Sequence, residues 1–439
     1  MSVVSGVQSN PFSGRHLLYF AMLLYLPFQS YLPNTSIGFG INLFNIFLLL
    51  LIFLSQGNNE YADDRNYRSF KLIILLFMGY TLISALLNCG DKGIYESIIT
   101  WKRLYFIPII FFITYKMLTT ERQIKAAVAV MSFITFLSSV QILRNNVAHS
   151  DAHYRDGLRY GGMFGPGGEN DLAAFMAINF FWFLFWSQET NQRSRKFLFL
   201  GMAGLAGLAC LYCYSRGGYI ALAAGLLYYG IRRYRVMLLA MILLFFTMSW
   251  WAPQPVRERL EMLTIDEKLD KDASAQLRLA IWEGGLAMVA DNFLYGVGPY
   301  NFGANIRKYA ELPDKSPTAS HNMYLRMAAE LGVPGFLLFV SILVVFIKTG
   351  YRLTKIAQGW QSTWATAYTA SIIPVFIVNY FGDRFFREEL TGYIWVSAAI
   401  ALKLHALSIQ QIAVNTVDSN LMTADIGTNL PKSTLMEHT

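Results

Sequence analysis

The chain has 439 residues, of which 54% are hydrophobic and only 15% are charged. Soluble domains carry about 25% charged residues, so this composition excludes an ordinary soluble domain and indicates a membrane protein. The formal net charge of +8 does not indicate nucleic-acid binding, because the positive residues lie in short segments between hydrophobic runs. Three cysteines are too few for a disulfide framework. Residues 1–15 show no signal-peptide pattern, so we expect the first hydrophobic run to be retained.

The hydrophobic runs predict membrane-spanning helices. A hydrocarbon core of about 30 Å takes about 20 apolar residues per helix. The runs are continuous rather than alternating, which favours helices over a barrel. We therefore predict an all-α polytopic membrane protein with about twelve transmembrane helices. They cover residues 16–33, 38–55, 70–88, 98–115, 124–142, 170–187, 197–214, 217–231, 236–252, 335–349, 361–381 and 391–408.

The basic residues predict the orientation of these helices. Similar clusters recur in alternate connections, and the positive-inside rule assigns that side, with both termini, to the cytoplasm. The clusters are Arg65, Arg68 and Lys71; Lys116, Arg122 and Lys125; Arg193, Arg195 and Lys196; Arg232, Arg233 and Arg235; and Lys348, Arg352 and Lys355.

Four regions follow from this topology. Residues 1–252 form an N-terminal bundle of about nine helices, and residues 253–334 form a large outer, periplasmic loop with a histidine-bearing helix. Residues 335–408 supply the C-terminal membrane helices. Residues 409–439 are polar, which predicts a disordered cytoplasmic tail. Within the outer loop, helical spacing from Ala275 to Val289 predicts an amphipathic helix that lies along the membrane surface as a lid.

The outer loop ends at His321, where aqueous chemistry meets the bilayer. Histidine is the side chain best suited to exchange a proton near neutral pH. It is followed by Asn322, nine residues, and then Gly332 and Gly335. This pattern resembles the signature of the bacterial O-antigen ligase, O-antigen polymerase and O-oligosaccharyltransferase superfamily. The resemblance covers roughly residues 160–350 and is closest to the lipopolysaccharide O-antigen ligase.

Several arginines are expected on the outer side, close to hydrophobic spans. The clearest is Arg216, which lies between two glycines and a serine in a very short connection. Arginine suits phosphate because it stays charged and offers a planar fork of donors, and ionisable residues within membrane spans tend to be functional. The cluster therefore predicts a lipid-linked phosphate or pyrophosphate ligand. Interface anchoring or pairing with acids remains the alternative for each of them: Arg103, Arg216, Arg278, Arg384 and Arg387.

The resemblance implies roles for some of these residues. Arg216 and Arg278 match the family's arginines that are thought to hold the donor pyrophosphate, and Trp282 follows Arg278 by one turn. His321 would act as the general base, or would only hydrogen-bond the phosphate or acceptor. Supporting roles are assigned to Arg103, Asn322, Trp282 and Arg384.

The implied reaction is that of a metal-independent membrane glycosyltransferase without a cofactor. An O-antigen ligase moves a preassembled glycan from undecaprenyl pyrophosphate to a hydroxyl of lipid A-core, with inversion, at the periplasmic face of the bacterial inner membrane. O-antigen polymerase and protein O-oligosaccharyltransferase remain alternatives. A lipid-linked oligosaccharide flippase is a more distant one.

Other motifs are interpreted as structural. His149 and His153 fit a solvated loop better than a metal site. The Asp270 to Asp272 pair lies in a mixed-charge run, which favours a solvated face over a metal site. Cys210 and Cys213 are expected to pack within a span. Asn170 or Asp171 is expected to cap a helix, and Glu330 to serve packing or pairing. Gly332 and Gly335 are expected to end the histidine-bearing helix.

Overall fold

The computed structural model describes residues 12–29, 42–55, 65–148, 160–165, 167–247, 250, 254, 256–257, 273–314 and 316–428. Every regular element in these ranges is a helix, which confirms the predicted all-α class for the described part of the chain. The elements of the first half are α1 (Gly14–Tyr25), η1 (Leu26–Phe28), α2 (Leu43–Leu54), α3 (Arg65–Leu87), η2 (Gly90–Lys92), α4 (Gly93–Tyr105), α5 (Ile109–Met117), α6 (Glu121–Ala148), η3 (Gly162–Phe164), α8 (Glu169–Asn179), α9 (Phe181–Glu189) and α10 (Arg193–Tyr212).

The second half contains the helices that carry the predicted site. They are α11 (Arg216–Arg232), α12 (Arg235–Phe246), α16 (Ala273–Asp291), α17 (Phe302–Asn305), η4 (Ile306–Lys308), α18 (Met323–Ile356), α19 (Gly359–Tyr380), η5 (Arg384–Phe386) and α20 (Glu388–Thr428).

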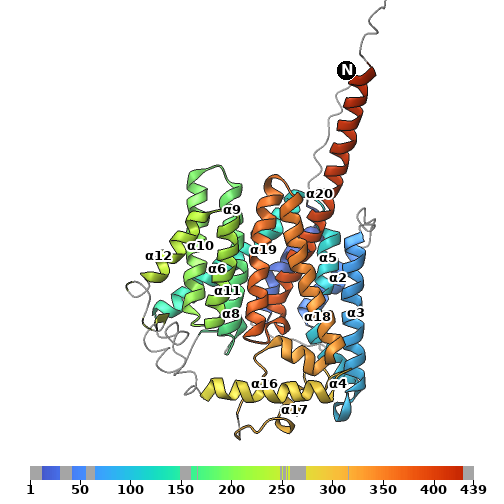
Figure 1. Cartoon of the computed structure of the whole chain (residues 1–439), viewed down its shortest axis with the longest axis vertical. Helices are drawn as coiled ribbons and strands as arrows, with labels where there is room; N and C mark the ends of the chain where they lie inside the picture. The colour runs from blue at the N-terminus through green and yellow to red at the C-terminus, as the bar shows by residue number, and fades with distance from the viewer. Residues whose placement is uncertain are drawn as a thin grey trace, which may run out of the picture.

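Most of the long helices run side by side in one bundle (Figure 1). α11 packs against α8 and α19, and α18 packs against α3, α19 and α20. Large aromatic side chains fill the interior, among them the fully buried Trp182, Trp364 and Trp395. In contrast, α16 lies across one end of the bundle, and the α9–α10 and α18–α19 connections lie at the other end (Figure 1).

Five helices within the described residues are long and apolar enough to cross a membrane. A sixth candidate is the bent pair Gly90–Tyr105 and Ile109–Met117, whose parts meet at 45°. These spans confirm a multi-pass membrane protein, but the expected count of about twelve is not confirmed. Some expected spans are shorter helices, because α1 and α2 have 12 residues each. The five are Arg65–Leu87, Glu121–Asn145, Arg193–Tyr212, Met323–Ile356 and Glu388–Ala413.

The helix predicted in the outer loop is present, whereas the disorder predicted after residue 408 is not found in the described residues. A helix is present where residues 275–289 predict one, since α16 spans Ala273–Asp291. Its orientation across the bundle end agrees with a helix lying along the membrane surface (Figure 1). Disorder beyond residue 408 is not found as far as Thr428, because α20 continues to that residue. The segment retains helix-forming residues and contains no proline before Pro431.

Candidate active site at the end of the bundle

His321 lies in a tight turn immediately before α18. Its φ of 50° is the left-handed conformation, which is uncommon for a residue with a side chain. Both neighbours fix the turn: the Ser320 hydroxyl accepts a hydrogen bond from the Asn322 N–H at 3.3 Å and donates to Asp383 Oδ1 at 2.7 Å. A conformation that costs on the order of 1–3 kcal/mol persists only where surrounding contacts hold it. The backbone therefore presents His321 in a defined direction.

Asn322 begins α18 as its N-cap. Its Oδ1 accepts hydrogen bonds from the backbone N–H groups of Tyr324 at 3.0 Å and Leu325 at 3.2 Å. Such a cap satisfies donors that the first turn of a helix cannot pair internally. This oxygen thus holds the start of the helix, and Asn322 places His321 through the backbone.

Three charged side chains act on the half-buried imidazole of His321. Burial lowers its pKa from the ordinary 6.5, and the positive charge of Arg278 lowers it further. The negative charge of Asp383 opposes these effects, and Arg384 adds a smaller lowering. The structure therefore brings Arg278 and Arg384, both predicted site residues, into the electrostatic environment of His321, which favours a neutral imidazole near pH 7.

α16 supplies Arg278 together with Trp282, one turn further along the helix. The Trp282 indole Nε1 donates to the Ser320 carbonyl at 2.9 Å, and its ring meets Tyr380 edge-on at 5.7 Å. These contacts tie the middle of α16 to the turn that carries His321. Trp282 therefore positions both α16 and the histidine turn.

The glycines of the histidine motif create a break in α18. Gly332 has φ 70°, and a Cβ there would lie 2.3 Å from the Leu294 carbonyl oxygen. The opposing turn fits equally closely, since a Cβ at Gly296 would lie 2.3 Å from the Glu330 carbonyl carbon. Only glycine allows two backbones to approach in this way. The expected role of Gly332 is confirmed: its non-helical backbone interrupts the histidine-bearing helix, and a second helical stretch of α18 follows as far as Ile356.

Backbone groups exposed by this break find partners in the turn before α17. Val297 N–H donates to Ala329 O at 2.9 Å, Gly298 N–H to Glu330 O at 2.9 Å, and Val333 N–H to Phe293 O at 2.8 Å. From α3, the Ser84 hydroxyl donates to Tyr295 O at 2.8 Å. Every buried polar group needs such a partner. The end of α16 is therefore joined firmly to the middle of α18.

A buried ionic network connects the motif helix to the segment before α20. The Arg326 guanidinium pairs with Glu330 Oε1 at 2.9 Å and with Asp383 Oδ2 at 2.7 Å. Glu330 is fully buried and also accepts from the Tyr300 N–H at 2.9 Å. The expected pairing role of Glu330 is confirmed. Because Asp383 also accepts from Ser320, the network reaches the histidine turn.

Arg384 and Arg387 share one buried carboxylate. Asp171, at the start of α8 and 1% exposed, pairs with Arg384 through Oδ1 and with Arg387 Nε through Oδ2 at 2.7 Å. Pairing with an acid, the alternative left open for both arginines, is thus found. Two guanidinium groups against one carboxylate still leave net positive charge. Arg384 is held beside His321 and retains an electrostatic effect on it.

Arg216 is the first residue of α11, beside the segment that leads to Asp383. The preceding Ser215 caps the helix, its hydroxyl accepting from the Gly218 N–H at 3.4 Å. A Cβ at Gly217 would lie 3.0 Å from Phe381 Cβ, so this turn packs against the segment that leads to Asp383. The glycines beside Arg216 therefore permit close approach of neighbouring helices and segments. They bring α11 against the chain that carries Asp383 and Arg384.

Arg103, near the end of α4, lies over the ring of Tyr300 at 5.3 Å from the ring centre. Arg326 lies over the same ring at 5.4 Å. Arg103 is exposed and is not itself among the groups that shift the pKa of His321. It therefore belongs to a neighbouring part of the same end of the bundle, connected to His321 through Arg326 and Asp383.

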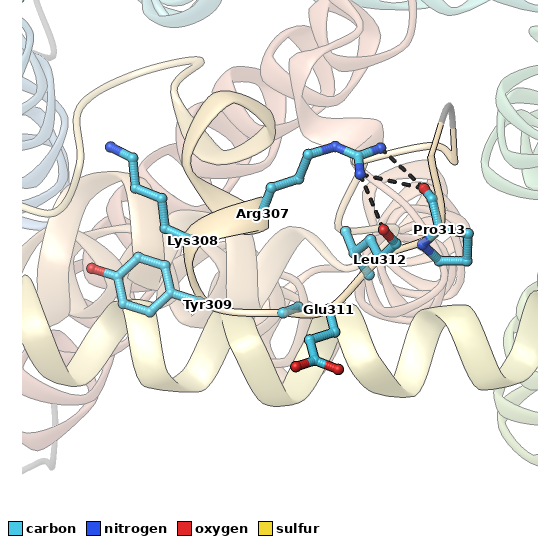
Figure 2. Close-up of a pocket in the computed structure, with 7 residues that line it drawn as sticks. Arg307, Lys308, Tyr309, Glu311, Leu312 and Pro313 are labelled. Carbon is cyan, nitrogen blue, oxygen red and sulfur yellow. Dashed lines mark hydrogen bonds between the residues drawn. The ribbon is translucent and has the colours of Figure 1, made fainter.

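None of the predicted site residues lines the pocket formed by residues 307–313. Figure 2 shows that its side chains diverge, and that the Arg307 guanidinium turns back to the carbonyl groups of Leu312 and Pro313. These bonds are 3.2 and 3.3 Å long, so Arg307 stabilises its own loop. The pocket is an irregularity of that loop, separate from the histidine cluster.

The cysteines that the sequence predicts to be structural are buried within the helical bundle. Cys210 and Cys213 are buried and donate to the Ala173 and Ala209 carbonyl groups. Across the described ranges, no group of three or more His, Cys, Asp or Glu side chains is arranged to hold a metal ion. His149, His153 and the pair Asp270 and Asp272 lie outside those ranges.

Most of the residues that hold the site together were not predicted from the sequence as parts of the site. Arg326 and Glu330 are four apart in the motif helix, so their pairing was visible as an i, i+4 signal. Asp383, Asp171 and Tyr300 gave no such signal, because their partners lie far away in the sequence. Asp171 was expected as a helix cap and is instead an ion-pair partner.

The fold and the site together define a class of protein: a helical membrane protein with a basic cluster that contains a histidine. The sequence model of the family described as O-Antigen ligase matches residues 201–340, which include Arg216, Arg278 and His321. This match confirms the similarity to the O-antigen ligase and polymerase superfamily that the histidine motif predicts. Curated proteins yielded no match to this chain.

Proposed function

We propose that this protein is an O-antigen ligase of the bacterial inner membrane. It transfers a preassembled glycan from undecaprenyl pyrophosphate to a hydroxyl of lipid A-core. The observation that carries the proposal is that Arg278, on the α16 helix that lies across the end of the bundle (Figure 1), and Arg384 both act electrostatically on His321. The family match supports a glycosyltransferase-type reaction on lipid-linked glycans in the O-antigen pathway.

His321 is assigned the role of general base. The acceptor hydroxyl attacks the anomeric carbon of the donor, its proton passes to the neutral imidazole, and the bond between that carbon and the pyrophosphate oxygen breaks. A lowered pKa keeps His321 neutral and ready to accept the proton. Direct displacement inverts the anomeric centre, and no covalent intermediate is required.

The arginines are assigned to bind the leaving group, the lipid-linked pyrophosphate. Negative charge grows on the pyrophosphate as the bond breaks, and fixed guanidinium groups in a partly desolvated site stabilise that charge. Arg278 and Arg384 act from the side of His321, and Arg216 acts from the start of α11. Asp171 keeps Arg384 in place without cancelling both positive charges of its arginine pair. This arrangement provides charge stabilisation from the protein itself, without a metal ion.

The positive-inside rule supports a periplasmic site. The basic clusters around residues 193–196 and 348–355 flank the α9–α10 and α18–α19 connections, at the end of the bundle opposite α16 (Figure 1). An excess of lysine and arginine marks cytoplasmic connections. We therefore assign α16 and the histidine cluster to the periplasmic side and both termini to the cytoplasm. The twelve-span topology belongs to this proposal.

Polymerase and protein O-oligosaccharyltransferase differ from the ligase only in the acceptor. A flippase would place its charged site near the membrane midplane, whereas the arginines here gather at one end of the bundle. The test is reconstitution of purified protein in liposomes with the lipid-linked donor and one acceptor at a time. Transfer to lipid A-core supports the ligase. Exclusive transfer to a second lipid-linked glycan or to a serine peptide identifies one of the alternatives, and transbilayer movement without transfer would exclude an enzyme.

A further inference from the structure

Tyr300 is an exposed aromatic residue that the protein holds rigidly. Its ring side chain is 53% exposed, yet its φ of 61° is the left-handed conformation. The backbone N–H is bonded to Glu330, a carboxylate that is completely buried. A residue in a strained conformation costs free energy and persists only where surrounding contacts hold it, and such residues cluster at functional sites. Packing of the interior does not supply that use.

Arg103 is fixed on this ring with its hydrogen-bond donors available. Its guanidinium stacks at 5.3 Å from the ring centre, a geometry that suits cation–π attraction. Among the residues that the structure describes, no carboxylate forms an ion pair with it. Arg326, in contrast, is neutralised by Glu330 and Asp383. Glu388 interacts electrostatically with Arg103, but the hydrogen bond that it accepts comes from Gln29.

The pair of Arg103 and Tyr300 lies outside the histidine turn and is connected to it through other side chains. A chain of contacts leads from Tyr300 to Arg326, from Arg326 to Asp383, and from Asp383 to Ser320 beside His321. Inverting displacement requires the attacking oxygen and the leaving oxygen on opposite faces of the anomeric carbon. With Arg216, Arg278 and Arg384 assigned to the pyrophosphate, the position of Arg103 remains for the other substrate.

We propose that Arg103 and Tyr300 form a subsite for an anionic sugar of the acceptor. The guanidinium binds a phosphate or carboxylate group in a planar, charge-assisted contact. The Tyr300 ring holds this guanidinium in place by cation–π attraction, and the exposed part of the ring contacts the sugar that carries the anionic group. The proposal rests on the proposed function for the identity of the acceptor.

The test measures acceptor binding without donor, and separately the KM values of both substrates. Purified wild type, Arg103→Gln, Tyr300→Phe and Tyr300→Leu are compared with lipid A-core oligosaccharide, the same oligosaccharide after dephosphorylation, and a carboxyl-reduced form. Lys308→Gln serves as the control, since Lys308 is an exposed cation that donates a hydrogen bond to Asn305 in its own loop.

Arg103→Gln is expected to weaken binding of the anionic acceptor, and to raise its KM, by about tenfold, the size of one charged hydrogen-bonded contact. The donor KM and kcat stay near wild-type values. Tyr300→Leu reproduces the effect, whereas Tyr300→Phe and Lys308→Gln do not. The modified acceptor that escapes the Arg103→Gln effect identifies the anionic group as phosphate or carboxylate.

Equal losses with all three acceptors, an unchanged acceptor KM, or a raised donor KM would each overturn the subsite. The proposed function fails separately: a wild type that binds the acceptor through Arg103 but never transfers glycan supports the subsite and excludes the ligase. Transfer that persists unchanged in Arg103→Gln supports the ligase and excludes the subsite.

Discussion

At the scale of single residues, the site is organised by unusual backbone geometry. Among the described residues, the non-glycine residues with positive φ are Tyr214, Tyr300 and His321. Each lies beside an assigned cation: Tyr214 two residues before Arg216, Tyr300 against Arg103, and His321 near Arg278. Strained conformations gather where the surrounding structure holds them for function. Their coincidence with the basic residues supports a common active site.

The lowered pKa of His321 predicts a specific pH dependence. A general base acts in its neutral form, so activity is present above its pKa and is lost as the pH falls through it. The acid limb of kcat/KM is expected to have its midpoint below pH 6.5, the ordinary value. Arg278→Gln removes a positive charge that lowers this pKa, so the midpoint should move to higher pH. A midpoint that moves lower, or not at all, would contradict the placement of Arg278 beside the imidazole.

The residues to which we assign the chemistry could be proposed from the sequence, whereas the residues that hold them in place could not. His321, Arg216 and Arg278 stand in short patterns that local spacing reveals. Asp383 and Asp171 act on partners 57 and 213 residues away, across helices whose packing is not encoded locally. Arg384 was identified as a supporting cation, but its anchor on Asp171 depended on the approach of α8 to the segment before α20.

At the scale of elements, the junction between α18 and the turn after α16 is the central feature. The Gly332 break lets three backbone hydrogen bonds join the turn to α18. α16 is thereby fixed at its C-terminal end, and Trp282 fixes its middle. The sequence predicted α16 and the role of Gly332. The continuation of α20 to Thr428 was not predicted, because a polar segment without proline can still form a helix.

Replacing Gly332 tests this junction. Gly332→Ala combines a left-handed residue, unfavourable by roughly 1–2 kcal/mol with a Cβ, with a collision against the Leu294 carbonyl. We expect a clear drop in the unfolding temperature in detergent and a loss of activity. Gly201→Ala is the matched control, since that position in α10 has open space around it. Equal unfolding temperatures for both variants would show that the junction does not contribute to stability.

At the scale of the whole molecule, the bundle separates charge by side. The α9–α10 and α18–α19 connections, which are flanked by basic residues, lie at one end, and α16, which carries Arg278, lies across the other (Figure 1). Composition and hydropathy predicted a helical membrane protein, and the structure and family match confirm it. The number of spans could not be predicted as reliably, because short, bent and polar-lined helices share the hydrophobic composition of full spans. α19, for example, buries Thr363, Thr366 and Asn379 within the protein.

The central claim is that fixed guanidinium groups hold a lipid diphosphate while His321 accepts the proton of the incoming sugar alcohol. Single-turnover transfer and donor binding by purified wild type and His321→Ala, in the same membrane, test it most directly. We expect transfer to fall by roughly 10²–10⁴-fold, the usual contribution of a general base, with donor binding unchanged. Transfer by His321→Ala at the wild-type rate would contradict the account.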